Sequence, residues 1–104
     1  MRVLHDYQGM AIRLTEERLA HILEHPEMAG LEGAIEGTLA RPEAVLLSYS
    51  DPSAPLYYRL YLGTRVGDKF LCIVVKVREE DAFVLTAYLT DKIKRGIPLW
   101  PPRT

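Results

Sequence analysis

The stretch Lys69–Lys92, KFLCIVVKVREEDAFVLTAYLTDK, decides the fold that this sequence predicts. Its two arms are rich in valine, isoleucine, phenylalanine, threonine and tyrosine, and the polar tripeptide Glu79-Glu80-Asp81 separates them. Neither arm contains glycine or proline. Two such runs around a short polar loop are typical of a β-hairpin. A three-residue loop predicts a register in which Lys76 lies opposite Val84.

Successive side chains of a strand point to opposite faces of a sheet, so the hairpin is predicted to have an apolar face and a mixed face. The apolar face must be covered by other parts of the chain. It comprises Leu71, Ile73, Val75, Val77, Phe83, Leu85, Ala87 and Leu89. The mixed face carries Lys76, Thr86 and Tyr88 within cross-strand reach of one another. We interpret the mixed face as the functional one.

Two helices and two further strands are predicted ahead of the hairpin. Thr15 is a suitable N-cap for the first helix, and Pro26 disfavours helical geometry at His25, where that helix should end. The remaining elements are a helix over Leu31–Ala40 and strands over Ala44–Ser50 and Leu56–Leu62. Helices segregated in sequence from an antiparallel sheet indicate an α+β fold. The predicted architecture is therefore two N-terminal helices packed on one face of a four-stranded antiparallel β-sheet.

The strand over Leu56–Leu62 supplies further candidates for the mixed face. We place its leucines, together with Tyr58, on the core that the helices cover. The alternate side chains, Tyr57, Arg59 and Tyr61, then lie on the open face beside Lys76.

The composition indicates one globular domain over residues 1–104, with poorly specified ends at 1–9 and 101–104. Of the 104 residues, 48% are hydrophobic and 26% are charged, which is ordinary for a single domain. The formal net charge of −1 gives no overall attraction to nucleic acid, so such a role would depend on a local basic patch. The single cysteine, Cys72, excludes an internal disulfide and a cysteine-based zinc site. With no signal peptide and no run of transmembrane length, we expect a cytoplasmic protein that does not enter membranes.

The polar residues of the mixed face suit the binding of a phosphodiester. Arg59 and Lys76 supply cations, Thr86 a hydroxyl and the tyrosines aromatic rings. Histidine transfers protons near neutral pH, so cleavage of RNA would need no metal. Each residue also has a structural interpretation, because a sheet lysine is often a solvated charge and tyrosines are often half-buried. His21 and His25 lie four residues apart, but no third metal ligand is evident, and we expect neither a metal nor a cofactor.

The order of short motifs resembles phage-associated nuclease-like families of the barnase–EndoU–colicin–RelE superfold. In these families a helical segment with a histidine-proline-glutamate motif precedes a four-stranded antiparallel sheet. The similarity covers about residues 10–100. The motifs are Arg13-Leu14-Thr15-Glu16-Glu17-Arg18, His21-Ile22, His25-Pro26-Glu27, Asp51-Pro52, Tyr57-Tyr58-Arg59, Val74-Val75-Lys76, Thr86-Ala87-Tyr88 and Ile93-Lys94.

The resemblance implies a metal-independent endoribonuclease, toxin-like or phage-derived, that acts on RNA such as tRNA. It makes His25 the acid or base, with His21 supporting or replacing it. It makes Arg59 and Lys76 clamps for the phosphate and Thr86 a hydroxyl that orients it. Tyr88 would position a base or ribose, and the flanking Tyr57 and Tyr61 are further candidates for substrate binding.

Two alternatives stay open at this point. The first is an RNA-binding or regulatory domain of the same fold without catalysis. The second is a homodimerising module that uses Ala44–Ser50 as an exposed edge strand. A toxin-like ribonuclease would also have a cognate antitoxin or immunity protein as a partner.

Overall fold

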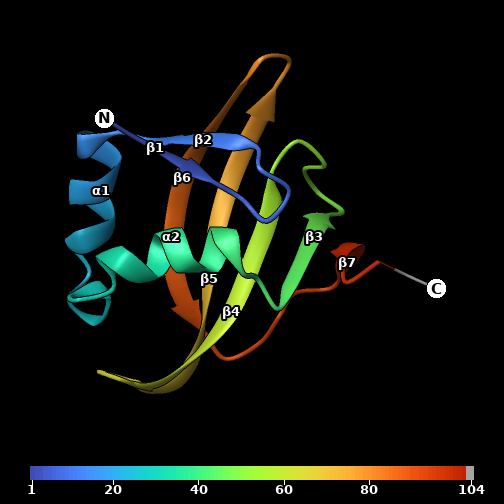
Figure 1. Cartoon of the computed structure of the whole chain (residues 1–104). Helices are drawn as coiled ribbons and strands as arrows, with labels where there is room; N and C mark the ends of the chain where they lie inside the picture. Colours follow the sequence, from blue (N-terminus) through green and yellow to red (C-terminus); the bar gives the residue numbers. More distant parts are fainter. Residues whose placement is uncertain (103–104) are drawn as a thin grey trace.

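The computed structural model, which describes residues 1–102, contains one seven-stranded sheet in the order β1-β2-β6-β5-β4-β3-β7 (Figure 1). The elements are β1 Arg2–His5, β2 Ala11–Leu14, α1 Glu16–Leu23, the short 3₁₀ helix η1 Pro26–Met28, α2 Glu32–Ala40, β3 Ala44–Ser48, β4 Pro55–Thr64, β5 Gly67–Arg78, β6 Asp81–Thr90 and β7 Gly96–Trp100. Strands β2 and β6 are parallel and all other neighbours are antiparallel. The predicted four-stranded antiparallel sheet is therefore wrong, because β3 to β6 form only the middle of a larger mixed sheet.

Strand β7 shows why the sequence did not reveal the whole sheet. It begins at Gly96 and contains Pro98, and both residue types normally mark loops or sheet edges. It pairs with β3, whose other neighbour is β4. Strand β3 is therefore an inner strand, so the predicted free edge at Ala44–Ser50 is also wrong.

The hairpin of β5 and β6 has the predicted register over most of its length but not near its turn. Val74 lies opposite Thr86, as predicted, whereas Lys76 lies opposite Phe83 instead of Val84. The register shifts between Val74 and Val75, where Leu85 is the extra residue of a β-bulge. The bulge turns Ala82 and Val84 to the helix-covered core in place of the predicted Phe83 and Leu85.

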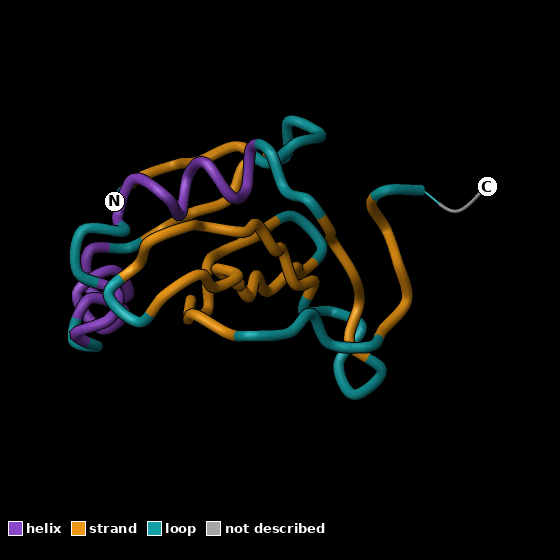
Figure 2. Tube along the Cα trace, turned by 90° about the horizontal axis from the view of Figure 1, so that it is seen from below, coloured by secondary structure: helices purple, strands orange, loops and turns teal. Residues whose placement is uncertain are grey.

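Helix α2 lies over one face of the sheet and α1 lies beside β6 at the edge of the same core, while the chain that leaves β6 crosses the other side on its way to β7 (Figure 2). On the helical side, the apolar stripes of α1 and α2, including Leu19, Ile22 and Ile35, pack against Leu71 and Ile73 of β5. A smaller cluster on the opposite face consists of the buried residues Leu46, Leu56, Tyr58 and Cys72. The backbone N–H of Lys94 donates to the Tyr58 hydroxyl at 3.3 Å, so the crossing segment covers part of the face that was predicted to be open.

The side chains of β4 have the opposite orientation to the predicted one. Tyr57 and Tyr61 point to the helical side, and Leu56 and Tyr58 point to the other. The helical side accepts tyrosines because their hydroxyls find partners there. Tyr57 donates to the Asp6 carboxylate at 2.8 Å, and Tyr61 donates to the carbonyl of Ala34 at 3.1 Å.

Helix α1 begins and ends where the sequence predicts. The hydroxyl of Thr15 accepts from the backbone N–H of Arg18 at 3.1 Å, which caps the N-terminus. Glu16 and Glu17 occupy the first turn, where the helix dipole favours negative charge. The backbone at His25, immediately before Pro26, is extended, so the last histidine lies just beyond the helix.

Candidate functional site

The structure places Lys76, Thr86 and Tyr88 on one face of the sheet, as predicted, but puts Arg59 on the other face and the histidines at α1. Lys76 points to the sheet face opposite the helices, where its ammonium group donates to Asp51 at 3.0 Å and to Ser53 at 2.6 Å. Hydrogen bonds from Ser53 and Lys76 hold the pKa of the Asp51 carboxyl below its usual range. Lys76 therefore fastens the turn before β4 onto the sheet.

Arg59 is on the helical side and is also occupied by the protein. Its guanidinium donates to the carbonyl of Arg41 at 2.6 Å, just after α2. This bond ties the C-terminal end of that helix to β4. Arg59 and Lys76 consequently lie on opposite faces of the sheet and do not form one phosphate clamp.

The predicted tyrosines are mostly packing residues. Thr86 and Tyr88 share the face opposite the helices, and Tyr88 packs beside Tyr58 and Cys72. Burial is the main cause that raises the pKa of Tyr88 and raises the pKa of Tyr58 to about 12. Burial and the neighbouring Asp6 raise the pKa of Tyr57. Together with Tyr61, which binds α2, these rings are largely unavailable as platforms for bases.

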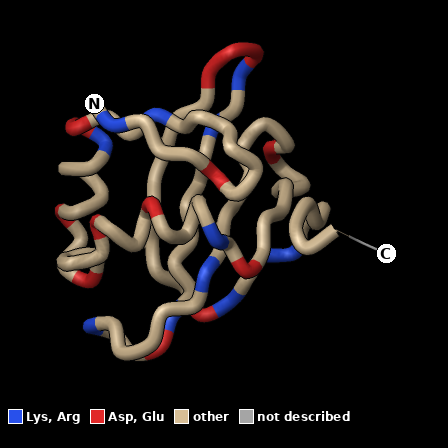
Figure 3. Tube along the Cα trace, viewed as in Figure 1, with Lys and Arg blue, Asp and Glu red and all other residues tan. Residues whose placement is uncertain are grey.

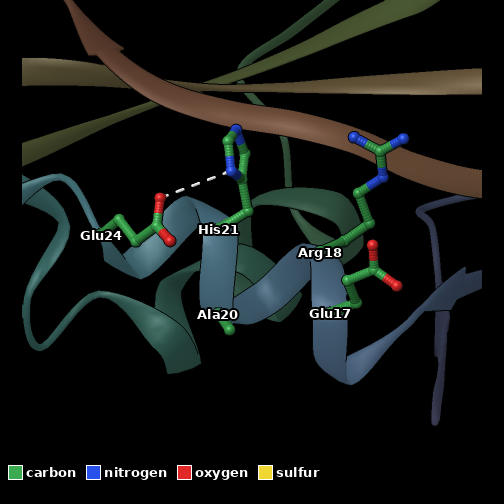
Figure 4. Close-up of a pocket in the computed structure, with 5 residues that line it drawn as sticks. All are labelled: Glu17, Arg18, Ala20, His21 and Glu24. Carbon is green, nitrogen blue, oxygen red and sulfur yellow. Dashed lines mark ion pairs between the residues drawn. The ribbon is translucent and has the colours of Figure 1, made fainter.

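The structure does bring three polar side chains, Arg18, His21 and His25, together at α1. A surface hollow of about 420 Å³ is lined by Glu17, Arg18, Ala20, His21 and Glu24 (Figure 4). His21 and Arg18 point to the same side of the helix, toward β6. The ring of His25 lies 6.5 Å from that of His21, nearly perpendicular to it.

The spacing of these residues explains their common orientation. Arg18 and His21 are three residues apart on one exposed side of α1. His25 follows His21 by four residues and lies just beyond the end of the helix. Leu19 and Ile22 face the core instead. Both imidazoles are largely exposed, at 62% for His21 and 61% for His25. A large ligand can therefore reach both rings.

Strand β6 lies beside the exposed side of α1 that carries Arg18 and His21. Within residues 1–102, β2 pairs with β6 at the single position Arg13–Phe83, so the remaining edge of β6 faces α1. The guanidinium of Arg18 donates to the carbonyl of Leu85 on that edge at 3.4 Å. This contact anchors one side of the guanidinium and leaves its other N–H groups for an anion.

Each histidine has a carboxylate beside its Nδ1 atom. Glu24 lies 3.5 Å from His21 Nδ1, and Glu27 lies 3.8 Å from His25 Nδ1. A carboxylate beside Nδ1 can orient an imidazole, while Nε2 remains available to a substrate. Two such pairs next to an arginine can move protons on either side of a bound phosphate.

We name Arg18, His21 and His25 the α1 triad. The signal for Arg18 in the sequence is its spacing of three residues from His21 on the helix that Thr15 begins. Within residues 1–102 no group of three or more histidine, cysteine, aspartate or glutamate side chains is arranged to hold a metal ion.

Comparisons with known proteins do not assign the chain to a family. No protein-family model matches the sequence, and searches of curated proteins and of solved structures found no match. Neither helix in the part of the chain that the structure describes is long and apolar enough to cross a membrane.

Proposed function

We propose that this protein is a metal-independent endoribonuclease, toxin-like or phage-derived, that acts in the cytoplasm on RNA such as tRNA. The observation that carries the proposal is the α1 triad, in which two carboxylate-paired histidines and an arginine share one exposed surface. The resemblance of the ordered sequence motifs to nuclease-like families supports the same activity. A small acidic antitoxin or immunity protein is the expected protein partner.

The α1 triad supplies the three groups that cleavage by the ribose 2′-hydroxyl requires. His21 removes the 2′-hydroxyl proton, and the 2′-oxygen forms a bond to phosphorus. The bond from phosphorus to the 5′-oxygen breaks, and protonated His25 gives its proton to that leaving oxygen. Arg18 binds the non-bridging oxygens, where negative charge develops in the transition state. The products are a 2′,3′-cyclic phosphate and a free 5′-hydroxyl.

We assign the base to His21 because it lies one helical turn from Arg18, which fixes the phosphate next to it. His25, beyond the end of the helix, then reaches the leaving oxygen from the other side. The ring centroids are 6.5 Å apart, so one phosphodiester lying across both exposed rings can contact both imidazoles.

The direct test is cleavage of total tRNA by the purified protein in the presence of EDTA. We expect cleavage to leave 2′,3′-cyclic phosphate ends. Replacing one ribose of the RNA by 2′-deoxyribose should prevent cleavage after that nucleotide only. The double variant His21→Ala/His25→Ala should be inactive. Intact RNA with the unmodified protein, or normal cleavage by the double variant, would show that the proposal is wrong. RNA that is bound but never cut would instead support the non-catalytic RNA-binding alternative.

A further inference from the structure

Lysine and arginine positions cluster along the chain at the end of the sheet where the β4–β5 hairpin and the chain between β6 and β7 meet (Figure 3). We name this group the basic end: Arg41, Arg59, Arg65, Lys69, Lys92, Lys94 and Arg95. Contacts join its segments, because Arg59 binds the carbonyl of Arg41 and Lys69 forms an ion pair with Asp91. Segments far apart in the sequence therefore meet at this end of the sheet, where their cations lie around its rim.

The basic end differs in charge from the rest of the molecule. Its seven cations are accompanied by three carboxylates, Glu43, Asp68 and Asp91, so its formal charge is 7 − 3 = +4, whereas the whole chain carries −1. Each of these carboxylates is bound by the protein. Glu43 accepts from the backbone N–H of Leu60, Asp68 accepts from that of Gly63, and Asp91 pairs with Lys69.

The segment between β6 and β7 carries the most accessible of these cations. Lys92, Lys94 and Arg95 are exposed, and within residues 1–102 their side chains form no ion pair. The hydrogen bond from the Lys94 backbone to Tyr58 holds the segment against the sheet. Three free charges on an anchored segment favour an extended polyanion over a single small anion.

Strand β6 connects this surface to the α1 triad. Arg18 contacts β6 at Leu85, and the strand ends at Thr90, immediately before the cationic segment. Five residues of strand, at about 3.3 Å each, separate the two surfaces by roughly 17 Å. A helical nucleic-acid strand advances about 3.4 Å per nucleotide, so this separation corresponds to about five nucleotides.

We propose that the basic end is a second RNA-binding surface, which holds the backbone of the substrate about five nucleotides from the phosphate that is cut. This inference rests on the proposed ribonuclease function. The exposed large hydrophobic side chains at the β4–β5 turn and between β6 and β7, Leu62, Val66 and Ile93, are aliphatic, so within residues 1–102 these two segments present no exposed aromatic ring for stacking on a base. It therefore binds phosphates and confers a preference for long RNA without a preference for sequence.

The test compares kcat/KM for an RNA of about four nucleotides with that for an RNA of about fourteen. The variant Lys92→Ser/Lys94→Ser/Arg95→Ser should lose about 10- to 100-fold in kcat/KM on the long RNA, through KM, and be unchanged on the short RNA. The salt dependence of binding to the long RNA should also become shallower, by about 2 in log–log slope. The matched control Arg2→Ser/Arg13→Ser/Arg78→Ser removes three charges elsewhere and should retain the preference for length. Near-ultraviolet circular dichroism verifies that both variants are folded.

The same proteins are tested for binding to fluorescein-labelled RNA of both lengths, using the His21→Ala/His25→Ala background so that cleavage does not interfere. Length-dependent binding that disappears only in the serine variant of residues 92–95 supports the second surface. Equal binding of both lengths, or no effect of that variant, overturns it even if the protein cuts RNA. If the protein cuts no RNA at all, the proposed function fails, while the binding result still decides the role of the basic end.

Discussion

The hydrogen bond between Tyr57 and Asp6 makes a sharp prediction about how the β1–β2 turn is attached to the sheet. Asp6 is only 6% exposed, and its carboxylate accepts from the backbone N–H groups of Gln8 and Met10, both at 2.9 Å, and from the Tyr57 hydroxyl at 2.8 Å. Tyr57 is itself 2% exposed. The variant Tyr57→Phe keeps the ring and removes one of the three donors to a buried carboxylate.

We expect Tyr57→Phe to lower the free energy of unfolding by about 2 kcal/mol. A hydrogen bond to a charged group is typically worth about 1.5–3 kcal/mol, and the remaining two donors limit the cost of the orphaned oxygen. Urea titration followed by circular dichroism measures the change, and the midpoint should fall while the slope stays constant. Tyr49→Phe is the matched control, because Tyr49 is 72% exposed, and it should have almost no effect.

A double-mutant cycle isolates the contact. If the two side chains interact as described, Tyr57→Phe should cost much less in an Asp6→Asn background than in the unmodified protein. A loss below about 0.5 kcal/mol for Tyr57→Phe, or equal losses in the two backgrounds, would refute the reasoning.

Three further predictions concern the sheet edge, the turn before β4 and acid stability. A Cβ atom at Gly96 would lie 2.3 Å from the carbonyl oxygen of Leu47, so Gly96→Ala should displace β7 and destabilise the protein by about 1–3 kcal/mol. The control is Gly33→Ala in α2, where an added Cβ meets nothing within 4 Å; it should be neutral or stabilising by up to about 1 kcal/mol. Equal effects of the two variants in urea titrations would contradict the close packing at Gly96. Lys76→Met should change kcat/KM for RNA by no more than about twofold, because Lys76 binds Asp51 and Ser53. A large loss of cleavage by this variant would show that Lys76 takes part in catalysis. The pKa of Asp51 and that of Asp81 are lowered by hydrogen bonds, from Ser53 and Lys76 to the former and from Arg13 to the latter. A carboxyl whose pKa is lowered on folding stabilises the protein above its unfolded pKa, near 4, and that stability is lost as the pH falls through the folded pKa. Asp81→Asn should therefore make melting temperature less dependent on pH below about 4, and an unchanged dependence would exclude this contribution.

Local patterns were sufficient to predict α1, α2 and the four strands of the meander. Thr15 and Pro26 mark the ends of the first helix in the sequence because capping and the geometry before proline act over a few residues. The strands β1 and β7 were missed for the opposite reason. Each is four or five residues long, and only its pairing with a distant strand makes it part of the sheet.

The candidate site could be predicted only in part, because the bulge and the orientation of β4 depend on tertiary contacts. One extra residue in β6 changes which side chains face the helices. Alternation alone could not decide the orientation of Tyr57 and Tyr61, since both faces of β4 are rich in large residues and their hydroxyl partners, Asp6 and Ala34, lie far away in the sequence. The proximity of His21 and His25 could be predicted because four residues separate them in the sequence, whereas the position of Lys76 relative to them depends on the whole sheet.

The measurement that tests the central claim most directly is kcat/KM for RNA cleavage in EDTA by two single-histidine variants. His21 belongs to the α1 triad, whereas His5 is an exposed histidine on β1. We expect His21→Ala to lower kcat/KM by about 100-fold or more, as loss of a general base does, and His5→Ala to leave it unchanged. Equal activity of the two variants would show that the surface of α1 does not perform the chemistry.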